Sequence, residues 1–134
     1  ARAVRNLDHG SAMTALTGIR VVELADSVAG EYCGKLLADF GAEVVKVEAP
    51  ARGSRTRAMA PVLVPEAAPE GSALFGYLNT NKFSVQLDHT SPAGGEGVRR
   101  LIEEADAVIA DDASPSVERP PNVVFCSVTP FGQN

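Results

Sequence analysis

The chain has 134 residues, 45% of them hydrophobic and 22% charged, and its formal net charge is −5. A chain of this length buries roughly two thirds of its unfolded surface, which predicts one domain with a single core. The acidic balance argues against a nucleic-acid partner, and the sequence contains neither a membrane-length apolar run nor a signal-peptide pattern. We therefore expect a soluble cytoplasmic protein.

The first predicted elements follow a tail or linker at residues 1–15, which has no apolar period. Residues 20–24 are a short apolar run with Val21, Val22 and Leu24, as in a strand buried on both faces, and the Val-rich residues 43–48 predict a second strand. A turn at Gly30 starts a helix between them, and Gly41 is its expected end. Because a parallel pair needs such a crossover helix, these strands should be neighbours. The predicted buried face of the helix comprises Tyr32, Cys33, Leu36, Leu37 and Phe40.

A loop at residues 51–71 comes next, with three arginines, three prolines and no regular period. A loop of this length within a compact domain is usually functional or disordered. Strands and helices then alternate to the end of the chain. The expected elements are a helix at 72–79, a strand at 84–87, a helix capped by Thr90 or Ser91 with Pro92 in its first turn, and strands at 107–110 and 123–128.

Five strands that alternate with helices predict an α/β domain with a Rossmann-like, doubly wound parallel sheet over residues 16–134. Such sheets bind ligands beyond the carboxyl ends of their strands, near the point where the strand order reverses. Four segments should meet at this edge: the loop at 26–31, the segment after Glu48, the loop after Ala110, and residues 129–134.

The individual residues at this edge leave several interpretations open. Gly30 and Gly34 begin a helix after a strand but do not complete GxGxxG, so the turn serves either phosphate binding or packing. Glu48 is either an exposed strand-end residue or the ribose-binding acid of a dinucleotide site. The arginines bind phosphates or form a solvated loop; they are Arg52, Arg55 and Arg57.

The remaining reactive side chains point to structural roles. His89 is expected to be a surface residue rather than a catalytic base. Cys33 and Cys126 have no CxxC spacing and no nearby His, so we expect no metal site and two buried thiols that act as small hydrophobes.

Several longer sequence segments, taken together and in their order along the chain, indicate more about the protein than any single residue does. They are LTGIRVVELADSVAG, LLADFGAEVVKVEAP, GSRTR, LNTNKFSVQLD, SPAGGEGVRRLIEEADAVIAD and NVVFCSVTPFGQ. In sequence and order they resemble the N-terminal region of class III CoA-transferases, a family that includes formyl-CoA transferase, carnitine CoA-transferase and 2-methylacyl-CoA racemase. The resemblance extends from Leu16 to the last residue.

This resemblance implies coenzyme A as the ligand, an interlocked homodimer, and an aspartate nucleophile that passes CoA between two acids through covalent intermediates. It implies that Val28, Ala29 and Gly30 lie against CoA. It also implies a CoA-site role for Asn81 and Lys82, the latter as a point charge for a phosphate. A racemase relative is the alternative within the family.

The chain departs from the family pattern at four places. Glu31 replaces a proline and places a negative charge where it could compete with a phosphate, Ala49 and Phe83 replace arginines, and DDASPS, which includes Asp112, replaces ENFRPG. In the family the nucleophilic aspartate follows the FGQ phrase, which here ends the chain.

We therefore expect the chain alone to be inactive and to work with a C-terminal catalytic portion. Two further hypotheses stay open at this point. One is a degenerate domain used for subunit or interdomain packing, and the other is a dinucleotide binder that relies on Glu48.

Overall fold

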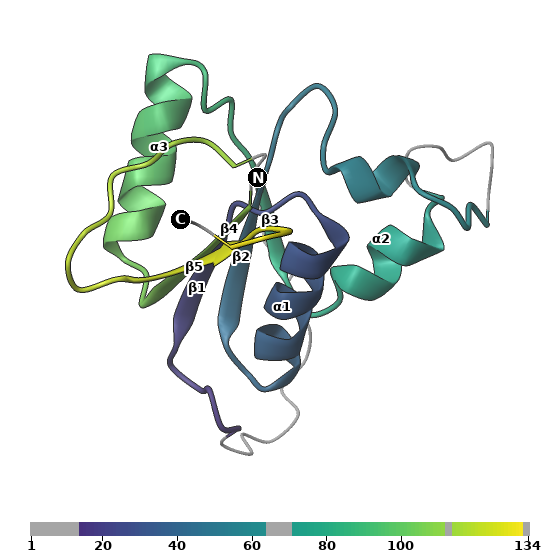
Figure 1. Cartoon of the computed structure of the whole chain (residues 1–134), viewed down its shortest axis with the longest axis horizontal. Coiled ribbons are helices and arrows are strands. Elements are labelled where there is room, and N and C mark those ends of the chain that lie inside the picture. The colour runs from purple at the N-terminus through teal and green to yellow at the C-terminus, as the bar shows by residue number, and fades with distance from the viewer. Residues whose placement is uncertain (1–13, 64–70, 112–113, 133–134) are drawn as a thin grey trace.

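The computed structural model describes residues 14–63, 71–111 and 114–132, and most of the expected tail at 1–15 lies outside these ranges. Five parallel strands form one sheet in the order β3-β2-β1-β4-β5 (Figure 1). The doubly wound α/β prediction is confirmed, because the connections after β1 and β3 run in opposite directions from the centre of the sheet. The strands are β1 (Arg20–Glu23), β2 (Glu43–Glu48), β3 (Phe83–Gln86), β4 (Ala107–Asp111) and β5 (Val124–Val128).

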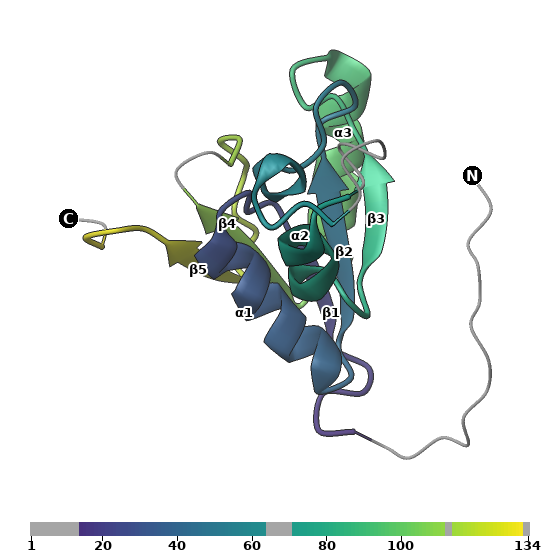
Figure 2. The ribbon, with the colours of Figure 1, turned by 90° about the vertical axis from the view of Figure 1, so that its right-hand side faces the viewer.

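The helices cover both faces of this sheet. Helix α3 (Pro92–Glu103) lies on one face, and α1 (Val28–Asp39) and α2 (Ala73–Leu78) lie on the other (Figures 1 and 2). The predicted cap of α3 is confirmed, since the Ser91 hydroxyl accepts the N–H of Gly94 at 3.1 Å and Pro92 occupies the first turn. No helix among the described residues is both long and apolar enough to cross a membrane.

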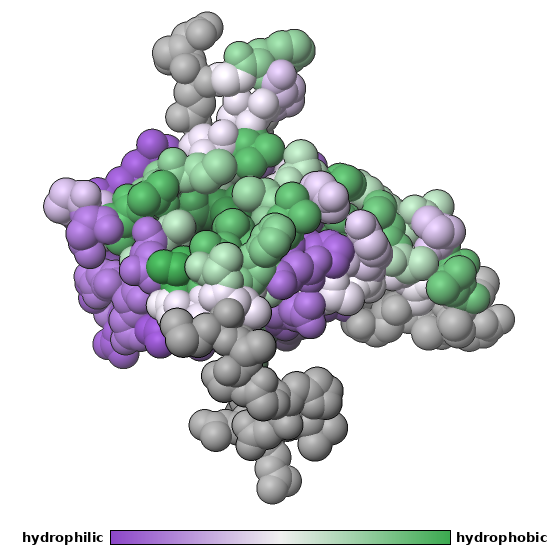
Figure 3. Space-filling view, turned by 90° about the horizontal axis from the view of Figure 1, so that it is seen from below, coloured by the Kyte–Doolittle hydropathy of each residue, from purple (hydrophilic) through white to green (hydrophobic). Residues whose placement is uncertain are grey.

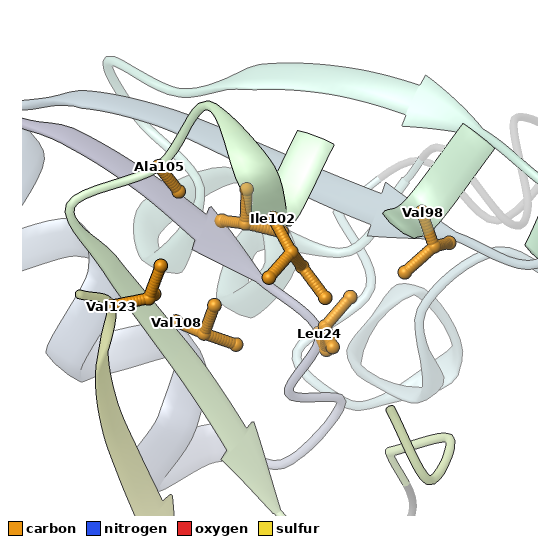
Figure 4. Packing of buried hydrophobic residues seen from close by; sticks show 7 residues of the cluster. Leu24, Val98, Ile102, Ala105, Val108 and Val123 are labelled. Atoms are coloured by element: carbon orange, nitrogen blue, oxygen red, sulfur yellow. The ribbon is translucent and has the colours of Figure 1, made fainter. Parts of the chain in front are cut away.

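The α3 face of the sheet holds an apolar core. Val22 of β1 belongs to this cluster with Val98 and Ile102 of the helix. Leu24, which directly follows β1, packs there too (Figure 4). The other buried members of this cluster are Ala105, Val108 and Val123.

The α1 face differs from its prediction. Tyr32, Leu36 and Phe40, expected inside, are 43%, 40% and 58% exposed. The buried side of α1 consists instead of Gly30, Glu31, Gly34 and Ala38. Tyr32, Leu36 and Phe40 thus form an outward stripe, whereas the other two expected residues, Cys33 and Leu37, are half-buried and pack against a second apolar cluster on this face. Figure 3 shows hydrophobic side chains gathered on the surface seen from below.

Glycines explain this orientation of α1. A Cβ at Gly30 would lie 2.3 Å from Ala25 Cβ, and one at Gly34 would lie 1.7 Å from Glu23 Oε2. Only the glycine side of the helix can approach β1 so closely, so the helix turns that side to the sheet.

The predicted loop at 51–71 contains local structure. A 3₁₀ helix, η1 (Arg55–Ala58), follows β2, and Val62 forms an antiparallel bridge with Ser72. Residues 64–70 of this predicted loop lie outside the described part of the chain. The arginine segment is thus held against the domain near the carboxyl edge of the sheet.

Candidate functional site at the carboxyl edge

A crevice of about 520 Å³ lies at the carboxyl edge of the sheet, between the ends of β1, β4 and β5. This is the point where the strand order reverses, since β1 and β4 are neighbours in the sheet. The predicted meeting of four segments is confirmed within the described residues. We call this space the rim crevice; its lining residues are Ser27, Ala29, Arg55, Asp111, Val128, Thr129 and Pro130.

The start of α1 is fixed by β4. The carboxylate of Asp111 accepts the N–H groups of Asp26 at 2.8 Å and Ser27 at 2.7 Å. Ser27 then caps the helix by accepting the N–H of Gly30 at 3.2 Å. This role of Asp111 could not be predicted from the sequence, because nothing local in DDASPS indicates that its first residue contacts a turn 85 positions earlier.

The three residues expected to lie against CoA occupy this helix start. Val28 and Ala29 are exposed, and Ala29 lines the rim crevice. Gly30 is buried against Ala25, so its absent side chain serves helix packing. Of the three, Ala29 is thus the one that the structure brings to the crevice wall.

Arg55 brings positive charge to the rim crevice. Its Nε donates to Asp26 Oδ2 at 3.2 Å, and its backbone N–H donates to Asp26 Oδ1 at 2.6 Å. Its side chain is 47% exposed, so part of the guanidinium remains open to solvent and to the crevice. Arg52 also pairs with Asp26, at 3.0 Å. One buried carboxylate therefore orients two of the three arginines.

The third arginine has a structural partner. Arg57 donates to both carboxylate oxygens of Glu48, at 2.7 and 3.0 Å. Glu48 is 3% exposed and also accepts from the Ser84 hydroxyl and the Ser54 amide. Burial opposes its ionisation, but these hydrogen bonds, Arg57 foremost, outweigh that effect and lower the pKa of Glu48 to about 2. The expectation of an exposed strand-end Glu48 is wrong, and its oxygens already have protein partners.

Glu31 does not present its charge at the rim. Its side chain is fully buried, its carboxylate pairs with Lys46 Nζ at 2.9 Å, and the Thr56 hydroxyl donates to it at 2.7 Å. Burial opposes its charged form, yet the field of Lys46 and these hydrogen bonds lower the pKa of Glu31. The concern that Glu31 competes with a phosphate is therefore not supported, because Lys46 neutralises the carboxylate inside the domain.

Asn81 and Lys82 lie outside the rim crevice. They precede β3, at the amino edge of the sheet, and Asn81 donates to Asp39 at the end of α1. The Lys82 ammonium donates to Glu23 Oε2 at 2.7 Å and to the carbonyl of Glu31 at 2.8 Å. Its side chain is 2% exposed, and burial lowers its pKa. The structure thus places both residues in the framework around α1, and their contact with CoA stays a prediction.

Other candidate groups are separate from this site. His89 is exposed and lines a different cavity of about 380 Å³, between α3 and residues 115–121. Cys126 is exposed and Cys33 is only half-buried, so the expectation of two buried thiols is wrong. Within the described ranges, no group of His, Cys, Asp and Glu side chains could hold a metal ion.

With this geometry established, comparison with known proteins identifies the chain's relatives. The model of CoA-transferase family III matches residues 16–134. The chain belongs to this family. The succinate–glutarate CoA-transferase of Agrobacterium fabrum is 39% identical over 88% of this chain, and a formyl-CoA:oxalate CoA-transferase of Afipia carboxidovorans is 34% identical over 88%. The match covers 33% and 30% of these relatives, so the chain spans about a third of their length.

Solved structures of family III relatives share the fold. A CAIB/BAIF family protein from Brucella suis is 42% identical, with a TM-score of 0.66 over 73% of this chain and 26% of that one. A hypothetical protein from Mycobacterium tuberculosis is 30% identical, with a TM-score of 0.69 over 90% of this chain and 35% of that one. Because the chain belongs to family III, Glu48 no longer supports the hypothesis of an unrelated dinucleotide-binding protein.

The residues that depart from the family pattern lie in different parts of the domain. Ala49 is half-buried beside a small cavity at the ends of β1 and β2, and Phe83 is 52% exposed on β3. Asp112 lies outside the described residues. Arg55 is the cation that the structure places in the rim crevice.

Proposed function

We propose that this chain is the CoA-binding portion of an acyl-CoA:carboxylate CoA-transferase, and that the rim crevice holds part of the acyl-CoA. The observation that carries the proposal is the position of Arg55 in a crevice at the reversal of strand order in a family III domain. Coenzyme A and carboxylate substrates are both anionic, and a guanidinium binds such groups through paired N–H donors.

The residues around Arg55 suit it to this task. Asp26 accepts from its Nε and its backbone N–H, which orients a side chain that lines the crevice and is 47% exposed. Ala29 and Val28 bring a small, exposed surface to the other side, where CoA would pass close to the helix start. We keep Gly30 in this proposal as the residue that lets the helix start approach the sheet.

The transfer itself is proposed to use an aspartate that this chain does not contribute. Support comes from the relatives, which are about three times as long, and from their names, which describe CoA-transferases for succinate and glutarate and for formyl-CoA and oxalate. The isolated chain is then expected to show no exchange of CoA between an acyl-CoA and a free carboxylate. Exchange above the blank would contradict this. Homodimerisation and a cytoplasmic location stay predictions.

Calorimetric titration with CoA tests the site directly. Loss of one charge-assisted contact costs about 1.5–3 kcal/mol, so Arg55→Ala should weaken CoA binding roughly 10- to 100-fold. Arg100→Ala is the matched control, because Arg100 is an exposed arginine on α3 whose side chain pairs only with Glu96 among the described contacts. It should bind CoA as the unchanged chain does. Equal affinity of the Arg55 and Arg100 variants would exclude Arg55 as a ligand contact.

A second candidate function is a non-catalytic packing domain. The outward stripe of α1, with Tyr32, Leu36 and Phe40 each at least 40% exposed, favours it. Absence of any CoA heat from the folded chain, together with self-association that Leu36→Lys abolishes, would support this function over CoA binding.

A further inference from the structure

The two cysteines lie on the same side of the sheet although 92 residues separate them in the sequence. Cys33, on α1, is half-buried and packs against the apolar cluster that contains Ile109 of β4. Cys126, on β5, is the register partner of Ile109. Because register partners in neighbouring parallel strands point to the same face, Cys126 also faces α1. Figures 1 and 2 show β5 running beside this helix.

Both cysteines neighbour Ile109, since Cys33 packs against its cluster from α1 and Cys126 is its register partner on β5. Burial raises the pKa of Cys33, and the neighbouring thiol of Cys126 raises it further. The two also differ in access, since Cys126 is exposed to solvent and Cys33 is only partly so. An external reagent therefore reaches Cys126 first, with Cys33 next to it.

We propose that Cys33 and Cys126 form a site of reversible oxidation, at which a small-molecule disulfide converts the two thiols into an intramolecular disulfide. The Cys126 thiolate attacks the small disulfide, forms a mixed disulfide and releases one reduced thiol. The Cys33 thiolate then attacks the sulfur of Cys126 and releases the second reduced thiol. The two cysteines lose two electrons and two protons, and the small disulfide gains them.

Such a bond would join two walls of the rim crevice. Ala29 lies one helical turn before Cys33, and Val128 lies two residues after Cys126; both line the crevice. The disulfide ties α1 to the edge strand β5 just below this opening, which holds the distance between the two walls constant. The site thus couples the redox state to the shape of the crevice, whatever ligand the crevice binds.

Oxidation of the 134-residue chain with oxidised glutathione, followed by alkylation and mass spectrometry, tests this site. The expected product has lost two hydrogen atoms, resists alkylation at both cysteines and migrates as a monomer without reductant. Cys33→Ser should instead keep one glutathione on Cys126, because its second thiol is missing. Glutathione retained on the unchanged chain, a chain-to-chain disulfide, or two free thiols would each overturn the proposal.

The midpoint of thermal unfolding tests separately whether the disulfide ties α1 to β5. A disulfide that closes this long loop should raise the midpoint by roughly 10 °C, and the reductant should reverse the shift. Cys126→Ala is the control, since the same oxidant should leave its midpoint unchanged. An unchanged or lower midpoint in the oxidised chain would contradict a tether between α1 and β5.

Discussion

The two faces of the same sheet are stabilised in different ways. On the α3 face, Val22 packs against Val98 and Ile102, and all three are at most 2% exposed. On the α1 face, the same strands bury Glu23 and Lys46 just as deeply, at 0% and 2%. Strand alternation thus gives the α3 face an apolar layer, and gives the α1 face a layer of buried charge beside a second apolar cluster that includes Val21, Val44 and Ile109.

The charged layer consists of two carboxylates and two ammonium groups. Lys46 pairs with Glu23 at 3.1 Å and with Glu31 at 2.9 Å, and Lys82 pairs with Glu23 at 2.7 Å. Burial disfavours all four charges, and their mutual attraction opposes it. The attraction prevails at Lys46, whose pKa is raised. Burial prevails at the other two: it raises the pKa of Glu23 and lowers the pKa of Lys82.

The two layers differ in which side chains they accept. An apolar contact accepts any side chain of suitable volume, whereas a buried charge requires its particular partner. The charged layer joins β1, α1, β2 and the residue before β3, and through Thr56 it also holds the segment that carries Arg55. We infer that this layer sets the position of the rim, while the α3 layer mainly supplies stability.

The largest effect is expected from Lys46→Met, which removes the shared cation and leaves Glu23 and Glu31 without their common partner. Breaking a buried pair in this way costs about 3–5 kcal/mol. Urea denaturation measures the loss. Arg99→Met is the control, because Arg99 pairs with Glu96 and Glu103 on the surface, and its unfolding midpoint should stay near that of the unchanged chain. Similar losses in both variants would remove the distinction between the layers.

Acid should next weaken the buried pair of Glu48 and Arg57, which lies outside the charged layer. The pKa of Glu48 is about 2 in the fold against an ordinary value of 4.5, so its contribution of about 3 kcal/mol is present above pH 4.5 and is lost as the pH falls toward 2. Stability measured between pH 5.5 and 2.5 should fall less steeply in Glu48→Gln than in the unchanged chain. Parallel slopes would show that Glu48 titrates normally.

Gly34→Ala tests the close approach that admits the buried carboxylate. The added Cβ would lie 1.7 Å from Glu23 Oε2, and the displacement should cost about 1–3 kcal/mol. Gly95→Ala is the matched helix control on the α3 side, where the new Cβ meets only the His89 carbonyl at 3.7 Å. It should gain about 0.5–1 kcal/mol from the lower backbone entropy of alanine. A neutral Gly34→Ala would mean that α1 can move away from β1 without loss.

The smallest change is expected on the apolar face. Ile102→Val removes one methylene from a 2% exposed side chain and should cost about 0.5–1.5 kcal/mol. Because no charge is involved, the loss should be equal at pH 7 and pH 4. A loss that depends on pH would show that the two layers are coupled across the sheet.

Local sequence patterns were sufficient to predict where the strands and helices of this fold lie in the chain. Residues 43–48 form the predicted strand without any shift, because a continuous apolar period is a property of the segment itself. Gly41 has a φ of +95°, which explains why a glycine follows α1. The alternation of strands and helices also predicted which loops meet at the carboxyl edge, since parallel strands all end on the same side.

The partners of charged side chains were beyond the reach of these patterns. A lysine in an apolar strand, Lys46, was the feature of the sequence that could indicate a buried charge network. Its acceptors, Glu23 and Glu31, could not be identified, because they lie 23 and 15 positions earlier in the chain. Glu48, expected at the surface, is buried because Arg57 reaches it from η1. Such contacts depend on how separate segments pack, which no local period encodes.

By itself, the sequence determined the order of the elements, the parallel sheet, the edge where a ligand site belongs and the resemblance to family III, because all of these depend on local periodicity or on phrases in order. Tertiary structure alone decided which side of α1 is buried, which arginine lines the rim crevice and that Cys33 and Cys126 face the same side of the sheet. Those outcomes follow from close packing at Gly30 and Gly34 and from charge pairs between distant segments, and both exist only once the chain is folded.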